Sequence, residues 1–274
     1  MALDPLPTPA LVGTPRRGVC RQNPDASARR PYLATGEVQV ICAELDLPPA
    51  RRHALSGTLS SDELDRAARF RFEPDRDRFI ARRGLLRELL GRHTGAEPAS
   101  LVFSYGPFGK PGPVSDSTGR PLHFSAAHSS GVAAVAISLG GPLGIDIEQV
   151  RDLPDLPALA ATVLSPREQR EWQNLPQAQR LQALFDVWAR KEAFLKGTGQ
   201  GLSRPSKEIE VPLHPCGPDC QLLVRDGTGQ VPGWTLRSLA LPGFAMALAL
   251  SFPPSAEMQS APGRMLVAPN WTGS

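Results

Sequence analysis

Short runs with a two-residue hydrophobic period alternate with longer runs of helical period through most of this chain. Glu37–Leu45 (EVQVICAEL) predicts a strand, whereas Leu59–Phe72 and Asp75–His93 predict helices. Further strands are predicted over Phe124–Ala127, Gly131–Ser138, Leu143–Val150, Ile209–Val211, Gln221–Arg225, Trp234–Leu239 and Phe244–Phe252, and a long helix over Gln177–Lys196. Because helices stand between strands that read as antiparallel, the mixed order favours an α+β fold over a doubly wound sheet.

The periodic region divides into two parts and is flanked by two tails. Residues 36–140 form a predicted N-terminal half and residues 141–252 a predicted C-terminal half, each with strands and helices. Residues 1–35 are rich in Pro and Arg and poor in large apolar groups, so they predict a disordered arm. Residues 253–274 predict a loose C-terminal tail.

Composition narrows the class of protein. A hydrophobic fraction of 41% supports a core, but no run of 18 apolar residues predicts a membrane span. Four cysteines in 274 residues are too few for a disulfide scaffold, and no apolar leader begins the chain, so we expect a cytoplasmic protein. Cys216 and Cys220 near His214 form only half of a common zinc pattern.

Two acids lie two residues apart in the predicted strand Gly144-Ile-Asp-Ile-Glu148. Strand geometry puts Ile145 and Ile147 on one face and Asp146 and Glu148 on the other. Neighbouring carboxylates repel each other unless a cation lies between them, and a hard divalent cation prefers such oxygen ligands. The alternative is an ordinary solvent-exposed strand face.

The long predicted helix carries a carboxylate beside its apolar stripe. Glu192 lies four residues after Trp188 and seven after Phe185, and Lys196 follows one turn later. A carboxylate in that position is costly unless it is paired or binds a metal. The alternative is an ordinary Glu192–Lys196 surface pair.

Three basic elements could bind phosphate. His128 precedes a turn of small residues, Lys110 lies in a Gly/Pro-rich loop, and arginines crowd residues 66–92. For His128 the alternative is a histidine that hydrogen-bonds locally in its turn, and for Lys110 it is an ordinary surface loop. For the arginines the alternative is a nucleic-acid-binding helix. Interleaved acids argue against nucleic acid.

The order of these motifs is more specific than any one of them. FGKPG, HFSAAHSSG, GIDIE and WARKEAFLKGTGQGL together resemble the Sfp-type 4′-phosphopantetheinyl transferases over residues 37–252. The helix start Ser165-Pro-Arg-Glu168 is similar to the family's Ser-x-x-Glu element. The resemblance implies two similar α/β halves related by a pseudo-twofold axis, with coenzyme A bound between them. It also implies Mg²⁺-dependent transfer of phosphopantetheine to a carrier-protein serine, with release of 3′,5′-ADP.

The resemblance implies roles for individual residues. Asp146, Glu148 and Glu192 would coordinate Mg²⁺, Glu192 would also be the base, and Lys196 would hold the pyrophosphate. Lys110, His128, Arg66 and Arg83 would bind the nucleotide. Ala127 is at a coenzyme A-binding position where the family often has serine, so it would contact coenzyme A through its backbone, and the missing hydroxyl would affect affinity more than catalysis. Lys191 matches the motif but points elsewhere on the helix, and Trp188 is assigned to packing.

The implied partners are apo carrier proteins of polyketide, nonribosomal-peptide or fatty-acid synthases. Such partners are usually acidic, and this chain has a net charge of +3. We expect no nucleic acid, no membrane and a monomer. The alternative is a non-catalytic regulator of the same fold that binds coenzyme A or a carrier protein; the three acids and Lys196 argue against it.

Overall fold

The computed structural model describes residues 33, 37–201, 204–213, 222–227, 229–251 and 265–266. The expected N-terminal arm lies outside these residues apart from Leu33, which packs against the core of the first half. Cys216, Cys220 and His214 also lie outside them. Among the helices that are described, none is long and apolar enough to cross a membrane.

The first half runs from residue 38 to residue 138. Its elements are β1 (Val38–Glu44), α1 (Pro49–Ser56), α2 (Ser61–Ala68), α3 (Glu73–Thr94), the 3₁₀ turn η1 (Pro98–Ser100), β2 (Val114–Ser115), β3 (Pro121–Ser129) and β4 (Val132–Ser138). The strand order is β10-β1-β4-β3-β2. Two residues of the expected loose tail form β10 (Met265–Leu266), which pairs parallel with β1; the other described pairs are antiparallel.

The second half repeats this plan from residue 143 to residue 250. Its elements are β5 (Leu143–Gln149), α4 (Leu156–Val163), α5 (Pro166–Gln173), α6 (Gln177–Thr198), η3 (Ser206–Glu208), β6 (Ile209–Glu210), β7 (Leu222–Asp226), β8 (Gly229–Leu241) and β9 (Phe244–Leu250), with strand order β5-β9-β8-β7-β6. In both halves a strand leads into helices, the last of 22 residues, and then into antiparallel strands that return to the first. The predicted α+β fold of two similar halves is confirmed.

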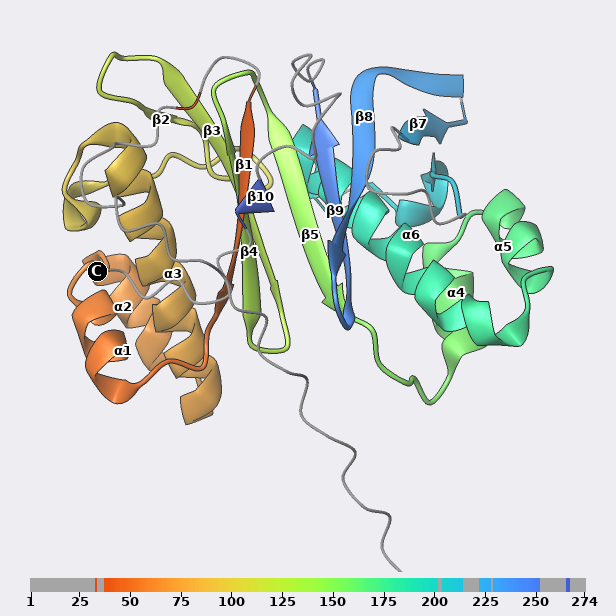
Figure 1. The fold of residues 1–274 in the computed structure, drawn as a ribbon, viewed down its shortest axis with the longest axis horizontal. Helices are drawn as coiled ribbons and strands as arrows, with labels where there is room; N and C mark the ends of the chain where they lie inside the picture. The colour runs from red at the N-terminus through yellow and green to blue at the C-terminus, as the bar shows by residue number, and fades with distance from the viewer. Residues whose placement is uncertain are drawn as a thin grey trace, which may run out of the picture. The chain divides into compact units, whose positions relative to one another are not determined.

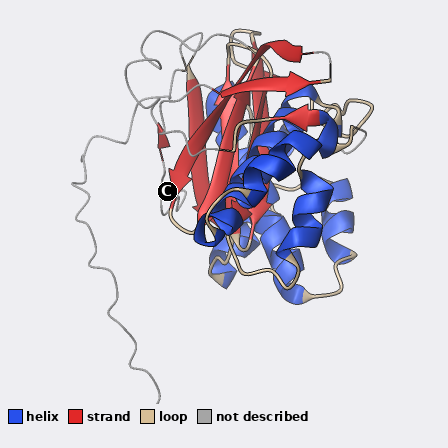
Figure 2. Ribbon diagram, turned by 90° about the vertical axis from the view of Figure 1, so that its right-hand side faces the viewer, coloured by secondary structure: helices blue, strands red, loops and turns tan. Residues whose placement is uncertain are grey.

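The sheets form the interior and the helices lie outside them. Helices α1–α3 cover one sheet and α4–α6 the other, as Figures 1 and 2 show. Apolar residues of both sheets meet between them, including Val40, Ile145, Ile147 and Leu248. At one side, β3 and β5 lie next to each other: the backbone N–H groups of Ile145 and Gln149 donate to the hydroxyls of Ser125 (3.2 Å) and Ser129 (3.1 Å).

Local signals explain most helix boundaries. Ser165 and Glu168 form the predicted capping box of α5. A second capping box, Ser60 with Glu63, begins α2. The predicted helix 59–72 was too long, because α2 ends at Ala68 and Pro74 begins α3 one turn later. Helices α1 and α4 were not predicted; each is only eight residues long.

Candidate active site

Asp146 and Glu148 lie on the face of β5 that α6 covers. Asp146 is 2% exposed, while Ile145 and Ile147 are fully buried on the opposite face, in the interface between the sheets. The predicted alternation is therefore confirmed. The alternative of a solvent-exposed acidic face is wrong for Asp146, because α6 covers it.

Helix α6 approaches β5 through two glycines. A Cβ atom on Gly144 would lie 2.0 Å from the Ala193 carbonyl oxygen and 2.3 Å from the Gly197 nitrogen. Only glycine fits at this point of β5. The close approach brings the end of α6, with Lys196, onto the acidic face of the strand.

Asp146 is paired on one oxygen only. The Lys196 Nζ donates to its Oδ1 at 2.5 Å, while its buried Oδ2 has no hydrogen-bond partner among the residues that the structure describes. Burial raises the pKa of Asp146 to about 7, against the lowering effect of Lys196, and the charges of Glu148 and Glu192 raise it further. The alternative of an ordinary Glu192–Lys196 surface pair is wrong: Lys196 pairs with Asp146, and Glu192 has no ion-pair partner among the described residues.

Glu148 completes a group of acids that interact electrostatically. Its Oε2 accepts a hydrogen bond from the Ser129 hydroxyl at 3.2 Å. Burial raises the pKa of Glu148, and the charge of Glu192 adds to the rise. The orphaned oxygen of Asp146 and two neighbouring carboxylates suit a divalent cation. Within the described ranges, however, no three such side chains stand close enough together to form a ready metal site. In this arrangement, the Lys196 ammonium neutralises Asp146.

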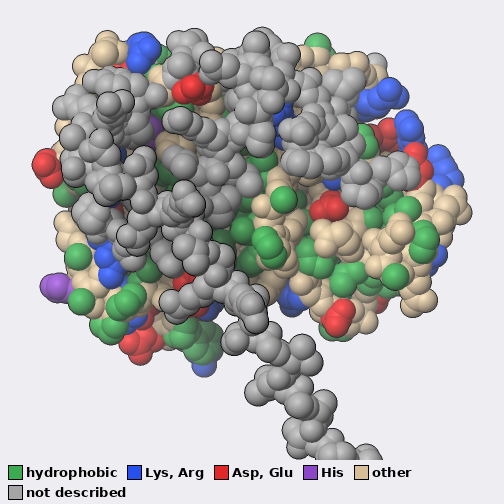
Figure 3. All heavy atoms as spheres, in the orientation of Figure 1, with side chains coloured by type: hydrophobic (Ala, Val, Ile, Leu, Met, Phe, Trp, Pro, Cys, Tyr) green, Lys and Arg blue, Asp and Glu red, His purple; other side chains and the backbone are tan. Residues whose placement is uncertain are grey.

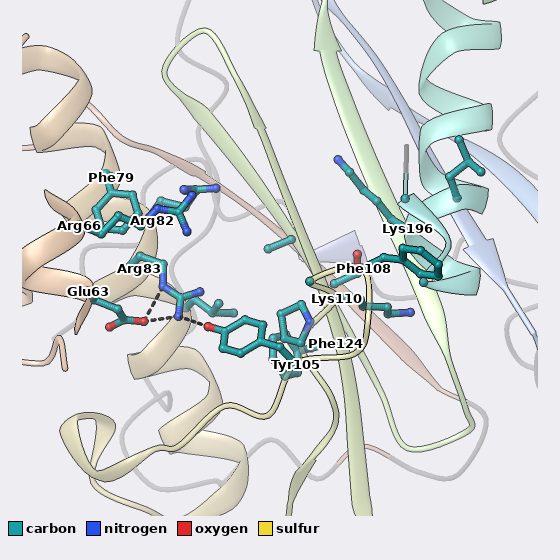
Figure 4. Close-up of a pocket in the computed structure, with 18 of the residues that line it drawn as sticks. Glu63, Arg66, Phe79, Arg82, Arg83, Tyr105, Phe108, Lys110, Phe124 and Lys196 are labelled. Atoms are coloured by element: carbon teal, nitrogen blue, oxygen red, sulfur yellow. Dashed lines mark hydrogen bonds and ion pairs between the residues drawn. The ribbon is translucent and has the colours of Figure 1, made fainter. Parts of the chain in front are cut away.

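A pocket of about 330 Å³ opens beside Lys196, between the two halves. Its walls come from α2, α3, β3, the loop 105–111 and the end of α6 (Figure 4). Basic side chains gather on it: Arg66, Arg82, Arg83, Lys110 and Lys196. Figure 4 shows the arginines on the α2–α3 side and Lys196 on the opposite side, with Phe108 beside Lys196 and Tyr105 next to Arg83. Its size and charge suit a phosphorylated ligand.

Two of the predicted basic residues in this pocket already have partners. Arg83 donates to Glu63 and, at 3.4 Å, to the Tyr105 hydroxyl. Lys110 donates to the carbonyls of Leu143 (3.1 Å) and Gly197 (2.5 Å), and burial lowers its pKa to about 8. Arg66 is exposed, with its guanidinium over the Phe79 ring.

Two other predicted residues do not line the pocket. Ala127 is buried in the interface between the sheets, because alternate residues of β3 face opposite ways. Any ligand contact from Ala127 is therefore left to its backbone. His128 lies on the α3 side of β3, where its Nδ1 is 3.5 Å from an Arg82 nitrogen. Desolvation, and next the charges of Arg82 and Lys196, lower its pKa to about 4.

Arg82 was missed by sequence reasoning. It lines the pocket, and its buried Nε has no hydrogen-bond partner within the described part of the chain. Burial lowers its pKa to about 10, and the charges of Arg83 and Arg66 act in the same direction. A cation held beside other cations, with no acid paired to it among the described residues, is suited to an anion. The sequence feature that could have pointed to Arg82 is its place next to Arg83, which was predicted to bind the nucleotide.

Comparison with known proteins shows the family to which the chain belongs. Residues 142–249 match the family model of the 4′-phosphopantetheinyl transferase superfamily. The 4′-phosphopantetheinyl transferase HetI of Nostoc sp. is 40% identical over 68% of this chain and 78% of its own length. The transferase psf-1 of Bacillus pumilus is 33% identical over 53% of this chain and 60% of its own length. Sfp of Bacillus subtilis is 26% identical over 71% of this chain and 83% of its own length. This chain belongs to the 4′-phosphopantetheinyl transferase superfamily.

Proposed function

We propose that this protein transfers the 4′-phosphopantetheine arm of coenzyme A to a serine of an apo carrier protein and releases 3′,5′-ADP. The observation that carries the proposal is buried Asp146, with one unpartnered oxygen, beside Lys196 and two further acids at the edge of an arginine-walled pocket. A non-catalytic binder would have no use for these acids, of which Asp146 is buried and whose mutual repulsion destabilises the fold.

Asp146, Glu148 and Glu192 are the residues that would hold Mg²⁺. When bound, the ion supplies charge neutralisation at the pyrophosphate. The oxygen of Asp146 that would bind the ion is Oδ2, because Oδ1 accepts from Lys196. The Lys196 ammonium, which lines the pocket, can bind the pyrophosphate with its other N–H donors and stabilise the charge on the departing 3′,5′-ADP.

Glu192 is the proposed base. The carrier serine oxygen forms a bond to the β-phosphorus while the bond from that phosphorus to the bridging oxygen breaks, and the electron pair leaves with 3′,5′-ADP. The serine proton passes to Glu192, directly or through a water molecule. Its lack of an ion-pair partner among the described residues leaves this carboxylate able to accept the proton.

The nucleotide would bind along the basic wall of the pocket. Arg66 and Arg82 are suited to its phosphates, and His128 lies beside Arg82. The Lys110 ammonium donates to two backbone carbonyls, so only its remaining N–H donor would be available to the nucleotide. Arg83 shapes the wall through Glu63 and Tyr105.

The remaining features of the proposal concern the protein's surroundings. The enzyme acts as a monomer, because one chain supplies both walls of the pocket. The proposed location of the reaction is the cytoplasm, as expected from the sequence. Figure 3 shows basic and acidic side chains interspersed among the described residues of one face, rather than a field of one sign. Such a surface suits a protein partner better than a nucleic acid.

Intact mass spectrometry of an excised apo carrier domain tests the proposal. After incubation with the protein, coenzyme A and Mg²⁺, the domain should gain one phosphopantetheine group, and EDTA should abolish the gain. If several apo carrier domains of different types gain nothing, the proposed activity is wrong and the non-catalytic alternative takes its place.

A further inference from the structure

Lys191 lies next to Glu192 in the sequence but faces the other way. It is fully buried, and its Nζ donates to the Glu168 Oε2 at 2.5 Å and to the Val163 carbonyl at 2.9 Å. Neighbouring residues of a helix point about 100° apart. Lys191 therefore contacts the core behind α6, while Lys196 lies against the acidic face of β5.

Glu168 joins Lys191 to three other elements. Its carboxylate also accepts from the backbone N–H groups of Ser165 (2.7 Å), at the start of α5, and Val211 (2.8 Å), directly after β6. Val163, which accepts from Lys191, is the last residue of α4. One buried ion pair thus fixes α6 against α4, α5 and the end of β6.

The opposite side of α6 is held by the contact between Gly144 and Gly197. Helix α6 is therefore held on one side by the Lys191–Glu168 ion pair and on the side facing β5 by the close backbone contact at Gly144. A buried ion pair is a weak source of stability, since apolar residues of the same volume often do as well. What it provides that apolar packing does not is directional hydrogen bonds, which restrict rotation and sliding of the helix.

We infer that Lys191, acting through Glu168, is a positioning residue that holds Glu192 and Lys196 in place for the reaction. The inference rests on the proposed function for the identity of that reaction. Lys191 touches neither the pocket nor Asp146, so its effect passes through the placement of α6.

The first half supplies a matched control. Arg87 occupies the same position, the fifteenth of 22 residues, in α3 as Lys191 does in α6. It is 1% exposed and donates to Glu63, the capping-box acid of α2, at 2.6 Å. It also binds the carbonyls of Pro98 and Leu101, which precede the pocket loop. Breaking this pair disturbs the arginine wall and not the acids.

Lys191→Met and Arg87→Met, compared in three measurements, test the inference. These are kcat of transfer, binding of Mn²⁺ in the presence of coenzyme A, and the Kd of coenzyme A without metal. Loss of a residue that orients a metal ligand typically weakens metal binding or activity by about 10- to 100-fold. We expect Lys191→Met to lose this much in kcat and Mn²⁺ affinity with the Kd of coenzyme A within about twofold, while Arg87→Met raises that Kd. Lys191→Arg, which copies the first half, should restore most of the loss.

Thermal unfolding of each variant shows whether it is folded; if Lys191→Met is not, Glu168→Gln takes its place. A folded variant with a lower Tm but unchanged kcat and Mn²⁺ affinity would reduce Lys191 to a structural role and overturn the inference. Absence of transfer by the wild-type protein would instead count against the proposed function, and the Mn²⁺ titration would still decide the role of Lys191.

Discussion

The two halves of the molecule share a plan but differ at the residues between helix and strand. Position 16 of the long helix is glutamate in both, Glu88 in α3 and Glu192 in α6. Glu88 forms a two-point ion pair with Arg51, at 2.8 and 2.5 Å. Glu192 has no such partner among the described residues. The same acid at the same position is neutralised in one half and left available in the other.

The strands beneath the two helices differ in the same way. At the fourth residue of its strand, β1 has Ile41, which packs in the core under α3, and β5 has Asp146. At the second, β1 has Gln39, which hydrogen-bonds to His93 of α3, and β5 has Gly144, against Gly197 of α6. His93 and Gly197 both occupy position 21 of their helices.

The comparison separates scaffold from chemistry. Both halves keep a capping-box acid paired to a buried cation of the long helix. The first half fills the space between helix and strand with apolar groups and turns Arg66, Arg82 and Arg83 toward the pocket. The second half has glycines, Gly144 and Gly197, where β5 meets α6, and it places Asp146 between the strand and the helix. Substitutions at equivalent positions of the two halves test whether the first half is scaffold and the second carries the chemistry.

The largest expected effect is at the paired glutamates. Glu192→Gln should lower kcat by about 10²–10⁴-fold, the contribution typical of a general base. Glu88→Gln should change kcat only a few-fold, because Glu88 pairs with the half-buried Arg51 of α1 and neither residue lines the pocket. Equal losses in the two variants, measured by carrier-domain mass shift over time, would contradict the comparison.

Asp146 should make the metal-free protein less stable as pH rises. Its pKa is about 7 in the fold and near 4 in an unfolded chain, so the folded state holds the proton more tightly. This contribution to stability is present below about pH 4 and is lost as pH rises toward 7, by up to about 4 kcal/mol. Asp146→Asn should remove that loss.

Urea unfolding of the metal-free wild type and Asp146→Asn at pH 4, 5.5 and 7 measures the difference. The gap between the two proteins should widen with pH in favour of the variant. Parallel curves would mean that burial does not raise this pKa.

The contact between Gly144 and Gly197 should tolerate substitution less well than the equivalent hydrogen bond between Gln39 and His93 in the first half. Gly144→Ala forces a methyl group into the backbone of α6 and should cost about 1–3 kcal/mol in the free energy of unfolding. Gln39→Ala loses one hydrogen bond and should cost about 1 kcal/mol. Chemical denaturation gives both values; a tolerated Gly144→Ala would show that α6 can stand off from β5.

The smallest effect concerns the basic wall. Position 10 of the long helix is Arg82 in α3 and Asp186 in α6. Arg82→Ala should raise the Kd of coenzyme A about tenfold, equivalent to about 1.4 kcal/mol, as expected for one charge-assisted hydrogen bond. Asp186→Ala, which removes only an exposed contact with Gln182, should leave the Kd unchanged in calorimetric titration.

Local patterns predicted the features that depend on neighbouring residues. The alternation of Ile145-Asp-Ile-Glu148, the long helix and the α5 capping box are all confirmed. The division into two halves was read from the sequence, whereas their pseudo-twofold similarity came from the resemblance and is not displayed by the sequence itself. Pairs of distant residues could not be predicted, because periodicity does not encode them. Lys110 on the carbonyl of Gly197 and Lys196 on Asp146 are examples. A shared spacing was nevertheless present: an acid three residues after a capping serine, then a buried cation 24 or 23 residues later.

The serine hydroxyls between β3 and β5 have a consequence for solubility. The edge of a strand exposes N–H groups to which another chain can add as a further strand, and this is a common route to aggregation. On β5 the N–H groups of Ile145 and Gln149 are already taken by Ser125 and Ser129. The strand that carries the acids is thereby protected from intermolecular pairing by two side chains.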